Sequence, residues 1–169
     1  MSNLGDLMRT FADETNANLE AVIVETGLKM CNSVIKKTPV DSGFTQNSWF
    51  ITSSRPSKQK PEKVKGKKYP NQNKVLMKVE REAIKKLKQA IDKQTTFYMV
   101  NNQMSASVLE YGLYPKNVKR GTWDRKKKRY EIRSANGYSK QAPAGMVRIT
   151  KKEFKRGFIK SIKSMRAKK

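Results

Sequence analysis

The 169-residue sequence contains no histidine and a single cysteine, Cys31. Without histidine there is no Ser-His or Cys-His nucleophile pair and no imidazole ligand for a metal. One cysteine forms neither an internal disulfide nor a thiolate zinc site, so we expect a reducing compartment and a buried, apolar role for Cys31. No apolar run approaches the roughly 20 residues that cross a bilayer, and the first residues lack a secretory signal. These absences argue against an enzyme, a cofactor and a membrane partner.

Acidic residues are also scarce: 14 Asp and Glu stand against 38 Lys and Arg, for a formal net charge of +24. Residues 1–51 hold four basic and six acidic side chains, so nearly all the excess charge lies in residues 52–169. Hydrophobic residues make up 36% of the chain, below the roughly 45–50% that is usual for globular domains. Such a chain buries only a modest core, and we expect an oligomer in which a second subunit supplies further apolar burial.

Apolar residues recur at steps of three and four over much of the chain, which predicts helices. A proline in the first turn and a glycine just past the last turn mark helix ends. The predicted helices are residues 3–37, residues 75–91, residues 106–111 ended by Gly112, and a last helix with Pro143 in its first turn. The first of these ends where Thr38 precedes Pro39, because the residue before a proline avoids helical backbone angles.

Aromatic and β-branched residues predict strands at 44–53 and 95–100. Residues 54–73 are rich in proline and lysine and have little to bury, so we expect a basic mobile loop. Within the insertion 113–137, a charged run flanked by aromatic residues predicts a basic-tipped hairpin. The whole pattern predicts one α+β domain over 1–169. Its long N-terminal helix and its C-terminal helix would pack on a small, mostly antiparallel sheet.

Two acidic residues invite a catalytic interpretation. Asp41-Ser42-Gly43 matches the short signature of aspartic proteases, but it follows a helix in a proline turn, and a turn-and-cap role is favoured. Glu110 stands beside Tyr111 without a second titratable partner, so a structural ion pair with a lysine is favoured over a general base.

The basic tracts are the strongest purely physical signal. Lysines with interleaved aromatic residues can neutralise phosphates and stack on bases, yet the same residues suit a solvated or partner-facing surface, and the residues alone leave both open. No recognition-helix or zinc signature is present, which argues against sequence-specific reading. A further basic cluster spans 148–169. The candidate residues facing DNA or an acidic partner are Lys58, Lys60, Lys63, Lys65, Lys67, Lys68, Arg125, Lys126, Lys127, Lys128 and Arg129.

Four segments, in this order, resemble the neck or tail-completion proteins of tailed bacteriophages, also called head–tail joining proteins. They are Thr38-Pro39-Val40-Asp41-Ser42-Gly43 followed by Ser48-Trp49, Tyr98-Met99-Val100-Asn101-Asn102, Leu109-Glu110-Tyr111-Gly112, and residues 138–148 with Gln141-Ala142-Pro143-Ala144-Gly145-Met146 at their centre. The resemblance marks as motif or interface positions Pro39, Asp41, Gly43, Trp49, Asn101, Asn102, Glu110, Tyr111, Gly112, Gln141, Ala142, Pro143, Gly145 and Met146.

The resemblance implies an α+β subunit of the virion, assembled in the host cytoplasm into a homo-oligomeric ring of six copies. Its implied partners are the head connector or adaptor and the tail terminator or tail tube, with genome DNA passing through. It implies no catalytic, cofactor or metal-binding residues. The sequence departs from the usual pattern in the length of 54–73, in the insertion 113–137 and at residues 103–106, where a small aromatic pair is usual. The alternatives are a tail terminator ring and a free, non-specific nucleic-acid-binding protein.

Overall fold

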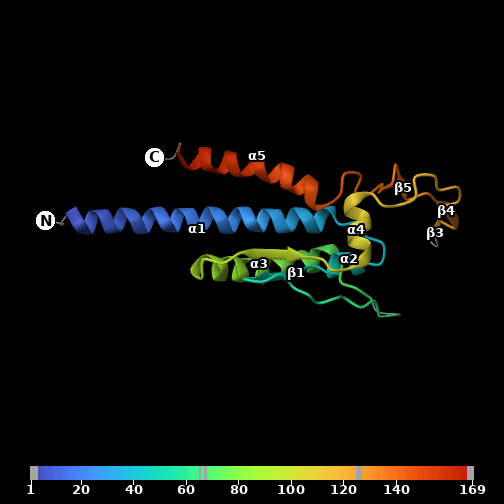
Figure 1. Cartoon of the computed structure of the whole chain (residues 1–169), viewed down its shortest axis with the longest axis horizontal. Helices are drawn as coiled ribbons and strands as arrows, with labels where there is room; N and C mark the ends of the chain where they lie inside the picture. Colours follow the sequence, from blue (N-terminus) through green and yellow to red (C-terminus); the bar gives the residue numbers. More distant parts are fainter. Residues whose placement is uncertain (1–3, 65, 67, 125–126, 167–169) are drawn as a thin grey trace.

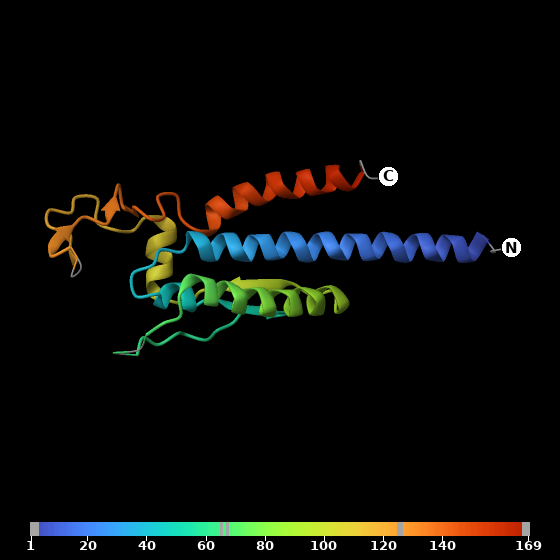
Figure 2. The ribbon, with the colours of Figure 1, turned by 180° about the vertical axis from the view of Figure 1, so that it is seen from behind.

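The computed structural model describes residues 4–64, 66, 68–124 and 127–166. The elements are α1 (Leu4–Lys37), α2 (Phe44–Asn47), β1 (Phe50–Ser53), α3 (Gln72–Asp92), β2 (Phe97–Val100), α4 (Met104–Tyr111), β3 (Thr122–Asp124), β4 (Arg129–Glu131), β5 (Ser134–Ala135), β6 (Tyr138–Ser139) and α5 (Val147–Arg166). Figure 1 shows α1 as the long axis of the molecule, with α5 along one side and α3 with β1 and β2 along the other. The hairpin strands β3 to β6 lie at the end away from the N-terminus, as the reverse view in Figure 2 also shows.

The long N-terminal helix is confirmed over the described residues, because α1 runs without a break from Leu4 to Lys37. It stops at Thr38, whose hydroxyl donates a hydrogen bond of 2.8 Å to the carbonyl oxygen of Val34. The next residue is Pro39, which disfavours a helical conformation at Thr38. The chain therefore leaves the helix in a defined direction, into the turn that leads to α2.

Most of the core lies between α1 and α3. The side chain of Asn71 caps α3 by accepting a hydrogen bond from the backbone N–H of Lys74 at 3.1 Å. Every third or fourth residue of α3 is buried against α1, as the helical spacing predicts. These buried residues are Val75, Val79, Ala83, Leu87 and Ala90. In α1, a Cβ added to Gly27 would lie 2.8 Å from Cδ2 of Leu87, so the glycine gives the Leu87 side chain its space.

The α+β class is confirmed, and the sheets are small. Strands β1 and β2 pair antiparallel with Ile51 opposite Met99, and Ile51 faces the core cluster that α3 shares. The predicted basic hairpin is present as β3 and β4, with Trp123 opposite Tyr130. A second, shorter hairpin, β5 and β6, follows it and was not predicted. Helix α5 packs along α1, so the two long helices contact each other.

The predicted strand over 44–53 is wrong in its first half. Residues Phe44–Asn47 form one helical turn, α2, and the strand is limited to Phe50–Ser53. Tertiary contacts explain the difference, because the buried Gln46 side chain donates a hydrogen bond of 3.0 Å to the carbonyl oxygen of Ile35 near the end of α1. The aromatic residues in 44–53, which led to the strand prediction, give no indication of this hydrogen bond. Burial of the polar Gln46 instead fixes α2 against α1.

The predicted start of the last helix is also wrong, because α5 begins at Val147, four residues after Pro143. Residues 139–145 form turns, with hydrogen bonds from Ala142 N–H to the Ser139 oxygen at 3.0 Å and from Gly145 N–H to the Ala142 oxygen at 3.2 Å. Pro143 therefore belongs to a turn, and its fixed φ suits that place as well as a first helical turn. The backbone N–H groups at the start of α5 instead donate to the carboxylate of Glu110, described below.

The core predicts the result of a truncation at Ile35, which is fully buried at the centre of the main cluster. Replacing Ile35 by Ala removes three buried carbons and leaves a cavity, which costs about 2–5 kcal/mol of unfolding free energy. Urea unfolding followed by circular dichroism measures the change. The matched control is Ile132→Ala, because Ile132 is 41% exposed and its truncation should cost less than about 1 kcal/mol. Equal losses for the two variants would contradict this packing.

Candidate functional site

The carboxylate of Glu110, at the end of α4, holds the N-terminus of α5. Its Oε2 accepts hydrogen bonds from the backbone N–H groups of Met146 at 2.7 Å and Val147 at 2.9 Å, and its Oε1 accepts from Arg148 at 2.9 Å. The first N–H groups of a helix have no partner within the helix, and a negative charge there also complements the helix dipole. Glu110 is 8% exposed, so a side chain distant in the sequence satisfies these donors away from water.

Arg148 completes the contact from the other side. Its Nε lies 3.4 Å from Oε1 of Glu110, and its Nη2 donates to the Glu110 backbone oxygen and, at 3.0 Å, to the hydroxyl of Tyr138. The guanidinium also lies over the rings of Tyr111 and Tyr138, at 5.5 Å and 5.6 Å from the centroids. The hydrogen bond with Tyr138 raises the pKa of Arg148 above its usual value. We call Glu110, Arg148, Tyr111 and Tyr138 the α4–α5 junction.

Two glycines allow this close approach. Gly145 has φ +79°, and a Cβ there would lie 2.7 Å from the Glu110 backbone oxygen and 3.0 Å from its carboxylate. Gly112 ends α4 with φ +69°, as predicted, and a Cβ there would lie 2.5 Å from the ring of Tyr138. Only glycine adopts these backbone angles without strain and leaves this space. The Glu-Tyr-Gly and Ala-Gly-Met segments therefore form one packing unit.

The first family-like segment joins the same unit. The indole N–H of the buried Trp49 donates to the Thr38 hydroxyl at 3.0 Å, and the backbone N–H of Val40 donates to the side-chain oxygen of Gln141 at 2.9 Å. The turn after α1 is thereby fixed both to β1 and to the segment before α5. Ala142 and Met146 lie in the same hydrophobic core cluster as Trp49.

The two asparagines of the remaining segment bind backbone oxygens. Asn101 donates from Nδ2 to the Thr45 oxygen at 2.9 Å. Asn102 donates to the oxygens of Ser57 at 2.7 Å and Gln59 at 2.9 Å, which ties the first part of the basic loop to the end of β2. Their role is therefore to position the backbone.

The predictions for the two acidic residues have different outcomes. Glu110 is structural, but its partners are three backbone N–H groups and Arg148, and the expected lysine partner is wrong. Asp41 lies in an exposed turn and forms an ion pair of 2.8 Å with Arg133. Ser42 and Gly43 belong to the turn: the Ser42 hydroxyl accepts from the Phe44 N–H at 3.4 Å, and Gly43 precedes α2 with φ 82°. Among the described residues, no group of three or more Cys, Asp or Glu could hold a metal ion.

The basic candidates of both insertions are exposed where the structure describes them. These are Lys58, Lys60, Lys63 and Lys68 in the loop and Lys127, Lys128 and Arg129 in the hairpin. Lys65, Lys67, Arg125 and Lys126 lie outside the described residues. Figures 1 and 2 show the loop and the β3–β4 hairpin extending toward the end opposite the N-terminus of α1. Within this group, Lys127 and Arg129 share Glu131 as an ion-pair partner, and their hydrogen bonds lower the pKa of Glu131.

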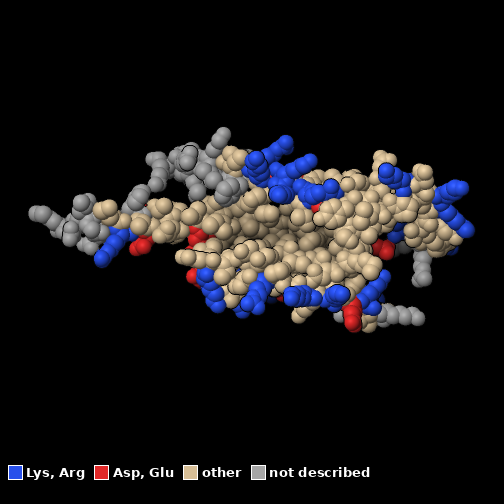
Figure 3. Space-filling model, viewed as in Figure 1, with Lys and Arg blue, Asp and Glu red and all other residues tan. Residues whose placement is uncertain are grey.

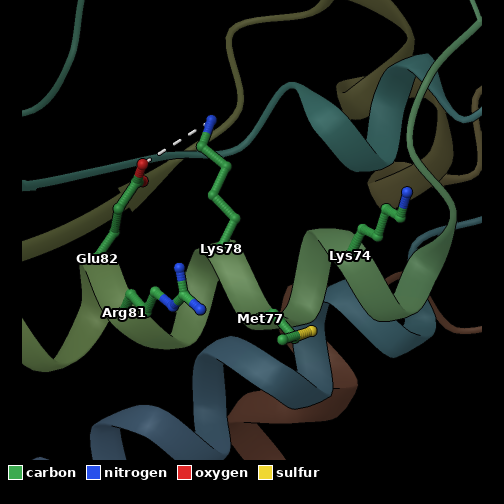
Figure 4. Close-up of a pocket in the computed structure, with 5 residues that line it drawn as sticks. All are labelled: Lys74, Met77, Lys78, Arg81 and Glu82. Atoms are coloured by element: carbon green, nitrogen blue, oxygen red, sulfur yellow. Dashed lines mark ion pairs between the residues drawn. The ribbon is translucent and has the colours of Figure 1, made fainter.

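A hollow of about 330 Å³ lies on the outer face of α3. Its lining residues all belong to that single helix, as Figure 4 shows: Lys74, Met77, Lys78, Arg81 and Glu82. Lys78 and Glu82 form an ion pair across it at 3.8 Å. The hollow holds no pair of groups suited to nucleophilic or acid–base catalysis, but it combines an exposed methionine with cationic side chains.

Comparison of the chain with known protein families, characterised proteins and solved structures finds no match. No helix of the described part of the chain is long and apolar enough to span a membrane. The α4–α5 junction must therefore be judged on its own geometry. Sequence reasoning missed Arg148 and Tyr138 as partners of Glu110, because no spacing rule links residues 28 or more positions apart. The only available signal was that Glu110 is the one acidic residue in residues 94–115 and lies between basic segments.

The junction predicts a large effect of Glu110→Gln. The amide keeps the shape but loses the charge, and its NH₂ group would face backbone donors, which costs about 2–3 kcal/mol of unfolding free energy. Thermal unfolding measures the loss, and hydrogen exchange should show faster exchange at the N–H groups of Met146, Val147 and Arg148. Glu82→Gln is the control, with a change within about 0.5 kcal/mol because its ion pair is exposed. Unchanged exchange at these three amides would contradict the capping role.

Cys31 is 1% exposed, as expected, and burial raises the pKa of its thiol from 9.0 to about 12. The thiolate is the reactive form, so its fraction at pH 8 falls on the order of a thousandfold for such a shift. We expect alkylation by iodoacetamide to be slow in the folded protein and to reach the rate of a free thiol in denaturant. Rapid labelling without denaturant would contradict this burial.

Proposed function

We propose that the chain is a structural protein of a tailed-phage virion, which forms a ring in the neck and joins the head connector to the tail. Genome DNA passes through this ring. The proposal assigns the chain binding to its own copies and to neighbouring virion proteins, and no catalysis or cofactor.

The proposal rests mainly on one observation. The four segments that resemble neck proteins are spread over residues 38–148, yet hydrogen bonds and core packing join them into one unit. Gln141 binds the turn at Val40, Trp49 binds Thr38, and Glu110 binds the start of α5. A chance likeness of short motifs would not require that they contact one another. That the segments do contact one another supports the resemblance, and with it the proposed role.

The charge distribution is consistent with this role. The exposed lysines of the loop and the hairpin extend from one end of the molecule (Figure 1). Lysine side chains of this kind screen phosphate charge without selecting a base sequence, because they contact the backbone of the nucleic acid. A passage for DNA needs such screening and is impeded by tight, specific binding. We propose that these residues face the genome or an acidic neighbour in the assembled neck.

Deletion of the gene from the phage that encodes it tests the proposal. We expect DNA-filled heads and separate tails of normal length, because the joint between them is missing. Electron microscopy of the lysate shows the particles, and supplying the chain from a plasmid should restore joined virions. A plasmid carrying Glu82→Gln is the matched control for one carrying Glu110→Gln, which should restore fewer virions.

Other outcomes would contradict the joint. Tails of irregular length would favour a tail terminator ring, since that ring stops tail growth. Complete, infectious particles, together with DNA binding by the isolated monomer that falls steeply with salt, would favour a free nucleic-acid-binding protein.

A further inference from the structure

The outer face of α3 carries a row of positive charges. Exposed cations follow one another at steps of four and three residues, which places them in one line along the helix. This line lies opposite the face that packs on α1, and at a rise of 1.5 Å per residue it is about 21 Å long. In Figure 3, lysine and arginine side chains line the edge of the molecule formed by α3. We call these residues the cationic row: Lys74, Lys78, Arg81, Lys85 and Lys88.

The chain itself neutralises little of this charge. Glu82 stands at one side of the row and forms an ion pair with Lys78 at 3.8 Å, but both side chains are exposed, and exposed pairs contribute little to stability. Asp92 follows the last cation by one helical turn. Within the part of the chain that the structure describes, no ion pair involves the other four cations. The row is therefore open to an anion from outside the chain.

The row also weakens the helix that carries it. Like charges three or four residues apart on a helix repel each other, and every step along the row from Lys74 to Lys88 is such a pair. A solvated face that served stability alone would alternate the signs of its charges. Packing of the opposite face on α1 holds α3 in place instead. An anion that lies along the row would relieve this repulsion.

We propose that the cationic row contacts the sugar–phosphate backbone of duplex DNA without reading its base sequence. Each strand of a duplex presents one phosphate per roughly 3.4 Å of the helix axis, so a straight row of about 21 Å faces several phosphates at once. Four of the five cations are lysines, which act as flexible point charges and do not select one geometry. Contacts of this kind position a backbone but carry no sequence information.

A phosphate backbone fits the row better than an acidic protein does. Lysine is depleted in protein–protein interfaces, whose centres are formed by apolar and aromatic anchors. The exposed apolar residues of α3, Met77 and Ile84, lie along one side of the row only. The hollow beside Met77 is lined by residues of α3 alone, and a single helix does not enclose the side chain of a partner.

The row enlarges the basic surface of the proposed function, and the inference rests on that function for the identity of the DNA as the genome. In Figure 1 the loop after β1 leaves the molecule on the same side of α1 as α3, and Lys58, Lys60 and Lys63 of this loop are exposed. The row and these lysines therefore lie on the same side of the molecule. In the neck, weak contacts from this side would let the duplex slide past.

Neutralisation of two positions in the row tests the contact in the purified full-length chain. Arg81→Gln with Lys85→Gln keeps the helix propensity and removes two phosphate partners. Binding to a fluorescein-labelled duplex of mixed sequence is measured by fluorescence anisotropy. At about 0.15 M salt it should weaken by about tenfold or more, and the slope of log K against log salt concentration should become shallower by about two. A duplex of another sequence should give the same affinities.

Arg9→Gln with Lys36→Gln is the matched control. These two cations are exposed and lie outside the row, and both variants lose the same two positive charges. The control should change the affinity less than about threefold, because only long-range attraction is weakened. The melting temperature of the row variant should be unchanged or higher, since repulsion within α3 is reduced. Equal weakening of DNA binding by the two variants would overturn the assignment to α3.

Lysine acetylation of phage particles separates DNA from a protein neighbour. Lys74 and Lys85 should be protected from an acetylating reagent in DNA-filled virions and should become reactive after the DNA is ejected, as measured by mass spectrometry. Protection that persists in emptied particles would overturn the inference in favour of an acidic protein partner. Particles that lack the chain altogether would contradict the neck joint, whereas the difference in DNA binding between the two variants would still support the contact on α3.

Discussion

The carboxylate of Glu110 is the contact on which the arrangement of this chain depends. It binds three backbone N–H groups at the start of α5, which have no partner within the helix. The direction of α5, its packing along α1 and the position of the hairpins between α4 and α5 all follow from this junction. Gly145 and Gly112 are required because any side chain there would collide with it.

Polar contacts around a small core explain how a chain with few apolar residues keeps a defined fold. The core cluster is confined to the contacts of α1, α3, β1 and the segment before α5, and polar contacts fix the connections around it. Buried Gln46 fixes α2 against α1, and Thr38 holds Trp49. Asn101 binds the backbone of α2, and Asn102 binds that of the loop. Each of these side chains forms at least one hydrogen bond to a backbone or side-chain partner, which gives a modest core a defined geometry.

The long helices, the basic hairpin and the α+β class could be predicted because periodic burial and turn residues are local signals. The errors occurred where a distant partner overrides a local signal. Phe44–Asn47 looks like a strand but forms a helical turn because Gln46 reaches Ile35. The α5 start was placed at Pro143 because its true cap, Glu110, lies more than thirty residues earlier in the chain. The same limit applies to the site: motif residues such as Asn101 and Gln141 were identified by resemblance, but their partners became visible only in three dimensions.

The proposed function requires that copies of this chain assemble into a ring. A density map of the purified oligomer, obtained by electron cryomicroscopy, tests this most directly. The account predicts a closed ring of copies of this chain whose open centre is wide enough for duplex DNA. An open or irregular aggregate, or a purified chain that stays monomeric, would contradict it.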